Sequence, residues 1–216
     1  MFKEKICTFT DKMPMEDMDL VLLGVKNIME VFRHPGGYSK GLYTDEKRTY
    51  PFRYLDQGNY GITFEWKDYV IKYIYNHMND GMEIVDEVTV YKDLQSIEAI
   101  PSLYGYNDEL LIIEKIKGKN VYEVATPENW HELQKKIYEI NKMLIKKGYY
   151  PYDLEYYVTP EGNIRLFDFN MVEKIEDGNV AMLEDLTSRM NKWKQILDEI
   201  TEDIYIRMAF ASGINY

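Results

Sequence analysis

Two aspartates stand on either side of a turn in the segment GYYPYDLEYYVTPEGNIRLFDFN, which covers residues 148–170. Asp153 and Asp168 each lie at the edge of an apolar run that is typical of a β-strand. A carboxylate inside the run LFDF loses its hydration on burial, at a cost of several kcal/mol unless a partner compensates it. A bound cation is the simplest partner, so Asp168 is a candidate metal ligand. For Asp153 the alternative is a residue that caps the turn after a helix.

Glycines and a lysine form a second candidate site in the segment LDQGNYGITFEWKDYVIK. Gly58 and Gly61 flank Tyr60 at the tip of a strand–turn–strand pattern, and Lys72 lies at the end of the next strand. Glycines let the backbone approach a phosphate closely, and a lysine on the following strand can neutralise its charge. Two glycines are also ordinary residues of a hairpin turn, so this pattern alone is compatible with both readings.

The groups that follow Lys72 in the sequence favour the interpretation of the glycines and Lys72 as a phosphate-binding site. A helical stripe after it offers Glu87, or less well Glu83, as a carboxylate that could hold the ammonium by a charge-assisted hydrogen bond. The strand that ends at Ile113 is followed by a connector whose exposed backbone could pair with the edge of an adenine. Together these groups predict a nucleotide site.

Periodicity and turn residues predict the elements that must position these groups. The sequence predicts a helix at 14–33, a loop or linker at 34–48, an antiparallel meander of three strands at 50–75, a helix at 80–97, two strands within 100–116 joined at Asn107-Asp108, a helix at 127–147, a strand pair around the turn 159–163, and a closing helix at 178–200. Thr126 as N-cap, Pro127 at the first position and Gly148 after the end delimit the helix at 127–147.

Composition limits the class of protein. The 216 residues are 45% hydrophobic, which suffices for one sizeable core or two small lobes. The formal net charge of −11 disfavours nucleic acid and a bare anionic membrane as partners. A single cysteine, Cys7, and three scattered histidines argue against a disulfide framework and a zinc site. With no signal peptide or membrane-spanning run, we expect a soluble, cytoplasmic protein, located in the producing cell or in a target cell, and its oligomeric state stays open.

The order of these residues resembles that of the protein kinase-like superfamily, over about residues 52–200. Gly58 and Gly61 match the second and third glycines of its glycine-rich loop, Val70-Ile71-Lys72 its lysine strand, Ile113-Glu114-Lys115 its hinge with Ile113 as gatekeeper, Pro151-Tyr152-Asp153-Leu154 its His-Arg-Asp-Leu, and Asp168-Phe169-Asn170 its Asp-Phe-Gly. The short tail after Asn170 makes the chain similar to minimal members of the superfamily, such as the RIO and Bud-type kinases and small effector kinases that bacterial pathogens inject into host cells.

The resemblance implies an α+β class and a two-lobed protein kinase-like fold, with an antiparallel-sheet N-lobe and a truncated, mainly helical C-lobe. The implied boundaries are an N-terminal helical extension and linker at 1–50, the N-lobe at 51–114 and a reduced C-lobe at 115–216.

It also implies ATP and Mg²⁺ as cofactors. The implied nucleotide-binding residues are Gly58, Tyr60, Gly61, Lys72, Glu87, Ile113, Glu114 and Lys115. Asp153 and Lys72 would be catalytic, with Asp153 orienting the acceptor hydroxyl, and Asp168 would hold the metal. The family has an asparagine five residues after its catalytic aspartate, where this chain has Val158. Counting thirteen residues back from Asp168 gives Glu155 instead, whose carboxylate would serve as the second metal ligand.

Two functions follow from the resemblance. The first is an ATP-dependent phosphotransferase, a minimal kinase that phosphorylates a protein Ser or Thr hydroxyl, with transfer of AMP as a variant of the same chemistry. The alternative is a pseudokinase that serves as a docking module for a nucleotide or a protein. Four departures from the family pattern favour this alternative, at Asp56, Pro151, Val158 and Asn170. The joint presence of Lys72, Glu87, Asp153 and Asp168 favours the enzyme, because these residues carry the charges that the reaction needs.

Overall fold

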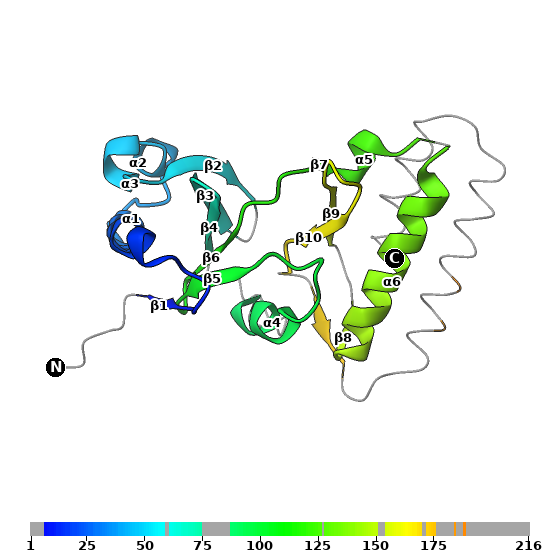
Figure 1. Cartoon of the computed structure of the whole chain (residues 1–216). Helices are drawn as coiled ribbons and strands as arrows, with labels where there is room; N and C mark the ends of the chain where they lie inside the picture. Colours follow the sequence, from blue (N-terminus) through cyan, green and yellow to red (C-terminus); the bar gives the residue numbers. More distant parts are fainter. Residues whose placement is uncertain are drawn as a thin grey trace. The chain divides into compact units, whose positions relative to one another are not determined.

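The fold was obtained as a computed structural model (Figure 1). It describes residues 7–58, 61–74, 87–126, 128–150, 154–169 and 172–175, together with Glu184 and Ser188. The chain divides into two compact units, one made of Met1–Met82 and Ser102–Lys115, the other of Glu83–Pro101 and Ile116–Tyr216. The first contains a six-stranded antiparallel sheet and the second a long helix with small sheets, so the predicted α+β class is confirmed.

The first unit is built on the six-stranded sheet. Its strands are β1 (Thr8–Phe9), β2 (Arg53–Gln57), β3 (Gly61–Trp66), β4 (Tyr69–Ile74), β5 (Leu103–Tyr106) and β6 (Leu110–Glu114), in the order β1-β5-β6-β4-β3-β2. Every neighbouring pair is antiparallel, which confirms the predicted meander and the second strand pair. At the β5–β6 turn the Asn107 side chain accepts the amides of Glu109 and Leu110, as asparagine does in tight turns.

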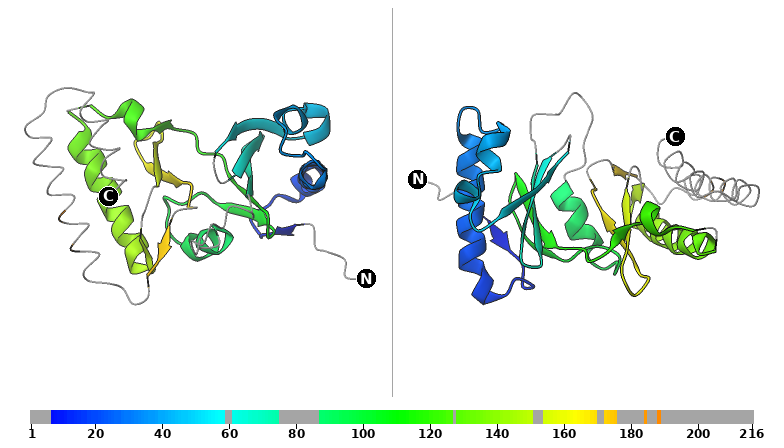
Figure 2. Two further views of the ribbon diagram at one scale, coloured as in Figure 1. Left: turned by 180° about the vertical axis from the view of Figure 1, so that it is seen from behind. Right: turned by 90° about the horizontal axis from the view of Figure 1, so that it is seen from above.

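Helix α1 (Met15–Arg33) covers one face of this sheet and confirms the helix predicted at 14–33. Its buried residues, among them Val25 and Ile28, share one hydrophobic core with Phe64 and Ile71 of the strands. The right-hand view of Figure 2 shows the helix running beside the strands. The helix approaches closely at Gly24, where a Cβ atom would lie 2.6 Å from the ring of Phe52.

The segment at 34–48 is not the simple loop that its glycines predicted. It contains two short helices, α2 (Lys40–Tyr43) and α3 (Glu46–Thr49). Asp45 caps α3 by accepting the amide of Lys47, and the ring of Tyr43 is buried against the core. The buried ring of Tyr43 and the cap at Asp45 therefore order a stretch whose composition is typical of a linker.

The second unit contains three helices and five short strands among its described residues. They are α4 (Glu87–Leu94), β7 (Lys119–Asn120), α5 (Val121–Val124), α6 (Trp130–Lys146), β8 (Tyr149–Tyr150), β9 (Glu155–Val158), β10 (Ile164–Phe167) and β11 (Glu173–Lys174). The strands form two small sheets, β10-β9-β7 and β11-β8. Residues 80–86 of the helix predicted at 80–97, and the closing helix predicted at 178–200 apart from Glu184 and Ser188, lie outside the described residues.

Helix α6 confirms the helix predicted at 127–147, but it begins later. Asn129 occupies the N-cap position instead of Thr126, whose carbonyl accepts the amides of Asn129 and Trp130. The buried Trp130 ring anchors the first turn. Gly148 ends the helix with a φ of 85°, the left-handed conformation that glycine adopts at helix ends.

No helix in the described part of the chain has both the length and the apolar character needed to cross a bilayer.

Candidate nucleotide site

Lys72 lies on the face of the six-stranded sheet that α1 does not cover. Successive side chains of a strand point to opposite faces, and its neighbours Ile71 and Tyr73 belong to the core beneath α1. In register, Lys72 stands between Thr63 of β3 and Leu111 of β6. The lysine is only 4% exposed, and lysine is rarely so buried without an anionic partner.

The next row of the same face contains the predicted gatekeeper. Val70 pairs with Glu65 on one side and with Ile113 on the other. Ile113 is completely buried. The structure thus places the lysine and an apolar patch, formed by Val70 and Ile113, on a single face, which is the surface that a base and its phosphates would need.

The turn at residues 58–61, here called the glycine turn, connects β2 to β3 at one end of this face. The amide of Gly58 donates to the carbonyl of Gly61 at 3.0 Å. A Cβ atom at Gly61 would lie 2.5 Å from the carbonyl oxygen of Tyr73, so the contact with β4 admits only glycine there, whereas a Cβ at Gly58 would meet nothing within 4 Å. Asp56 accepts the amide of its neighbour Gln57 at 2.8 Å. Tyr60 lies outside the described residues.

The connector after β6 is bound to the sheet through its amides. The amide of Glu114 donates to the carbonyl of Ser102 at 2.9 Å, and the amide of Lys115 donates to the carbonyl of Asp68 at 2.8 Å. The Glu114 carboxylate in turn accepts the amide of Ser102. A base edge would therefore have to pair with other backbone groups of the connector than these two N–H groups.

Sequence reasoning missed Glu65, a buried carboxylate on the Lys72 face. It binds the guanidinium of Arg53 and the ammonium of Lys115. Lys115, predicted to be a nucleotide ligand, thus has its side chain bound within its own unit. The alternation in GITFEW places Glu65 opposite the apolar Phe64, and a charged residue within a buried strand is the signal that could have identified it.

In the second unit, Glu87 holds the segment that follows β10. Its carboxylate accepts the amide of Phe169 at 3.3 Å, and the residue is only 4% exposed. The Phe169 ring is fully buried and packs edge-on against Tyr91, one turn further along α4, at a centroid distance of 4.9 Å. Helix α4 and the residue after Asp168 are thereby fixed to each other.

Asp168 has a left-handed backbone conformation, with a φ of 67°. Outside glycine this conformation is uncommon, and aspartate is one of the residues that tolerate it. Asp168 directly follows Phe167, the last residue of β10. Such local strain is often found at functional sites.

Glu155 lies directly across the β9–β10 pair from Phe167, and so beside Asp168 in register. Its exposed carboxylate accepts the hydroxyl of Tyr157 at 2.9 Å. Burial raises the pKa of Tyr157, and the neighbouring carboxylate of Glu155 raises this pKa further. Asp153 lies outside the described residues.

The residue types of Asp168 and Glu155 fit a magnesium ion, because both are carboxylates. Within the described ranges, no group of three or more His, Cys, Asp or Glu side chains gathers in the manner of a metal site built by the protein alone. Mg²⁺ in nucleotide enzymes is held by one or two carboxylates together with phosphate oxygens and water. Asp168 and Glu155 supply oxygen ligands of that type and number.

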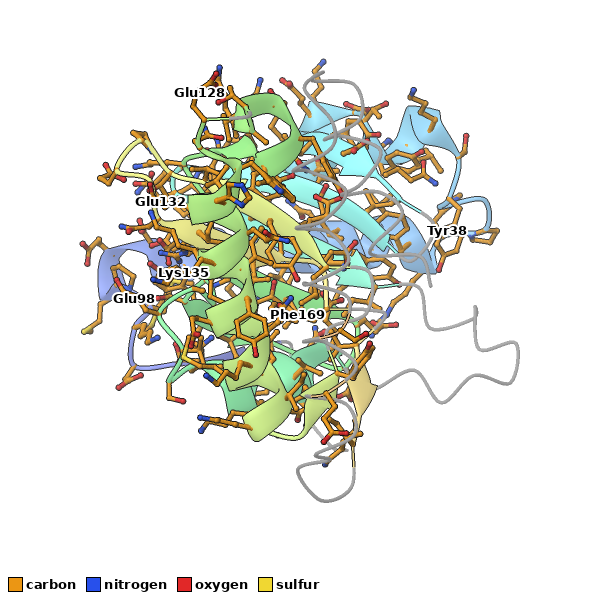
Figure 3. All side chains as sticks on the ribbon, turned by 90° about the vertical axis from the view of Figure 1, so that its right-hand side faces the viewer. Tyr38, Glu98, Glu128, Glu132, Lys135 and Phe169 are labelled. Carbon is orange, nitrogen blue, oxygen red and sulfur yellow. The ribbon has the colours of Figure 1, made fainter. Side chains whose placement is uncertain are left out.

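A separate hollow of about 580 Å³ lies on the second unit between α6, the β9–β10 turn and the segment after α4. Figure 3 labels Glu98, Glu132 and Lys135, which line it along one side of α6. None of the predicted site residues lines this hollow. Its lining carries charges of both signs, which gives no preference for a triphosphate.

Comparisons with known proteins give partial structural likenesses. No family model matches the chain, and no curated protein matches it. A crystal structure of WbdD matches 76% of this chain and 46% of its own, at 18% identity and a TM-score of 0.44. The bifunctional kinase-methyltransferase WbdD in another structure covers 82% and 44%, at 16% identity and a TM-score of 0.38. The complex of APH(2'')-IIa with streptomycin and ATP covers 51% and 39%, at 20% identity and a TM-score of 0.31. The chain thus spans less than half of each of these structures, and likeness of this degree does not assign it to a family.

Proposed function

We propose that the chain is an ATP-dependent phosphotransferase of the protein kinase-like type. The observation that carries the proposal is the buried Lys72, which shares one sheet face with the apolar Val70 and Ile113. The glycine turn lies beside the end of the same strand, where Gly61 pairs with Ile74. A buried cation next to an apolar patch suits the phosphates and the base of one nucleotide.

Each unit contributes its own groups to this function. In the first unit, Lys72 neutralises the phosphates, Gly58 and Gly61 cover them, and Ile113 lines the base pocket. In the second unit, Asp168 and Glu155 would hold Mg²⁺, and Glu87 keeps the segment after Asp168 in place through the amide of Phe169. When bound, the metal supplies charge neutralisation at the transferred phosphoryl group.

The transfer itself asks little covalent chemistry of the protein. The acceptor oxygen forms a bond to the γ-phosphorus while the bond to the ADP oxygen breaks, and the hydroxyl proton passes to the carboxylate of Asp153. Positioning and charge neutralisation therefore supply most of the rate enhancement. We take a Ser or Thr hydroxyl of a protein as the acceptor.

The test is incubation with γ-labelled ATP and Mg²⁺, with casein as a generic protein acceptor and with a set of small hydroxyl compounds. We expect label on protein for the wild type and its loss, by more than about a hundredfold, in Lys72→Met and Asp168→Asn. Lys26→Met, at an exposed position of α1, is the matched control and should keep full activity. Label on the small compounds alone would keep the phosphotransferase and overturn the protein acceptor.

One observation favours the docking module as a second candidate. The amides of Glu114 and Lys115 already donate within the first unit, which removes two donors from any base. If the wild type transfers no label and ATP with Mg²⁺ leaves its Tm unchanged, the docking function replaces the enzyme.

A further inference from the structure

The N-terminal segment, residues 7–50, contacts the end of β2 that leads into the glycine turn. Tyr43 of α2 is only 2% exposed, and its hydroxyl donates to the side-chain oxygen of Gln57. Gln57 is the last residue of β2 and directly precedes Gly58. A buried aromatic residue of the N-terminal segment is therefore bonded to the residue at which the turn begins.

A second aromatic residue, Phe32, connects Tyr43 to β4, the strand that pairs with β3. Phe32, at the end of α1, stacks on Tyr73 of β4 with a centroid distance of 4.2 Å and an interplanar angle of 13°. Tyr73 provides the carbonyl against which Gly61 packs. Phe32 also stacks on Tyr43, with centroids 6.0 Å apart, so one continuous cluster joins β2 to β4. We call Phe32, Tyr43 and Tyr73 the aromatic brace.

The register of the strands shows on which face the brace acts. Gln57 pairs with Ile62, and Ile62 pairs with Tyr73, so the three lie in one row across β2, β3 and β4. Ile62 and Tyr73 belong to the core beneath α1. Lys72, the neighbour of Tyr73, points to the opposite face. The brace thus supports the turn without occupying the face proposed for the nucleotide.

We propose that Phe32 and Tyr43 are positioning residues that hold Gly58 and Gly61, the described ends of the glycine turn, in place for contact with phosphates. A turn with two glycines has high conformational freedom. If the turn became ordered only when a nucleotide bound, the lost conformational entropy would weaken the affinity for the nucleotide. The brace fixes the end of β2 and the end of β4 that packs against Gly61 at folding, before a nucleotide arrives. The phosphate role rests on the function proposed above, whereas the effect of the brace on the turn does not.

The chain provides a matched control for this proposal at the opposite end of the same strands. There the Tyr69 hydroxyl donates to the carboxylate of Asp17 in α1, at 2.5 Å. Tyr43→Phe and Tyr69→Phe each remove one tyrosine hydroxyl that links the N-terminal segment to the sheet, and each retains the ring. Only the first touches the glycine turn.

The experiment compares the full-length variants well below the lower of their melting temperatures. Hydrogen exchange at the Gly58 amide is measured by NMR without nucleotide, and the Kd of ATP with Mg²⁺ by calorimetry. We expect Tyr43→Phe to speed exchange at Gly58 and to weaken ATP binding, each by about three- to fivefold, as the loss of one hydrogen bond predicts. Tyr69→Phe should leave the exchange rate at Gly58 and the Kd of ATP unchanged, while its Tm falls by about as much as that of Tyr43→Phe. Gln57→Met should reproduce the effect of Tyr43→Phe, and the double variant should add little.

The outcomes separate this inference from the proposed function. Faster exchange at Gly58 in Tyr43→Phe alone supports the brace, and if the wild type then binds no ATP, only the phosphotransferase proposal fails. Equal changes in Tyr43→Phe and Tyr69→Phe would show that the contacts serve general stability, and they would overturn the brace. The brace also fails if the wild type binds ATP and Tyr43→Phe changes neither exchange nor affinity.

Discussion

The hydroxyl of Tyr91 is a polar group in a fully enclosed position. It has no hydrogen-bond partner among the residues that the structure describes. Burial raises its pKa, and the carboxylates of Glu87 and Asp168 raise this pKa further, so the group stays protonated. An unsatisfied buried hydroxyl costs about 1–3 kcal/mol. The ring, by contrast, packs edge-on against Phe169 and stabilises the unit.

Tyr91→Phe should therefore leave the free energy of unfolding unchanged or raise it by about 1 kcal/mol, because it removes the hydroxyl and keeps the ring. Tyr91→Leu should lower it by about 2 kcal/mol through the lost ring contact. Urea unfolding of both variants measures the difference. A clear loss of stability in Tyr91→Phe would show that the hydroxyl has a partner in the folded protein.

Glu65 offers a second prediction at single-residue level. Glu65→Gln should lower the free energy of unfolding by about 2 kcal/mol, because a buried carboxylate loses two charge-assisted bonds. Lys115→Met should cost less, since Arg53 still neutralises the carboxylate. Urea unfolding at low salt tests both, and equal losses in the two variants would refute the shared role of Arg53.

For the candidate site, the residue types and their order were readable from the sequence, whereas their partners were not. Strand alternation places Lys72 and Val70 on one face, and this needs only local information. Glu65, by contrast, finds Lys115 at a separation of 50 residues. Such contacts depend on the register of strands that are distant in the sequence, and periodicity does not determine that register.

At the level of elements, helix α1 is fastened to the β3–β4 turn through Asp17. Its carboxylate accepts the ammonium of Lys67 and the hydroxyl of Tyr69, each at 2.5 Å. The hydrogen bond from Lys67, followed by that from Tyr69, lowers the pKa of Asp17. A carboxyl whose pKa is lower in the folded chain stabilises the fold when it is ionised.

This linkage predicts a pH dependence. Asp17→Asn should lower the Tm at neutral pH, by an amount that corresponds to about 1–2 kcal/mol. The contribution of Asp17 is complete above its unfolded pKa of about 3.9 and is lost as the pH falls through the lower folded pKa. The difference in Tm from the wild type should thus stay constant down to about pH 5 and shrink below about pH 4. Asp19→Asn, at an exposed position of the same helix, is the control and should not change the Tm at neutral pH.

The helices and strands were predictable where a sequence pattern, such as an apolar stripe or strand alternation, continues over many neighbouring residues. The apolar stripe of α1, the Gly148 end of α6 and the alternation of the meander strands each suffice for an assignment. The short helices α2 and α3 were missed because four residues carry no periodic signal, and the burial of Tyr43 depends on α1 and the sheet. Asn129 stands at the N-cap position of α6 without a side-chain capping bond to the helix, and its side chain accepts the amide of Thr126 instead, a contact that no helix-start pattern specifies.

For the molecule as a whole, the N-terminal segment is part of the first unit and not an appendage of it. Residues Val21, Val25, Ile28 and Phe32 share the core with Ile62, Phe64 and Ile71 of the sheet. A chain that begins at residue 51 would expose this apolar face to water.

Deletion of residues 1–50 should therefore abolish the native near-ultraviolet circular dichroism of the first unit and cause aggregation. The full-length variant Val25→Asp should destabilise in the same direction, by about 3 kcal/mol or more, because it buries an unpaired charge. Soluble expression of the shortened chain with native dispersion of its amide resonances would contradict this assignment.

The first unit is discontinuous, since the chain leaves it after Met82 and returns for Ser102–Lys115. The returning stretch contributes β6, which lies between β5 and β4 and is therefore an interior strand. During synthesis on the ribosome, the earlier strands must consequently wait, with the inner edge of β4 unpaired, until roughly half of the polypeptide has emerged from the exit tunnel. The nascent chain is thus most exposed to misassociation and to chaperone binding in that interval.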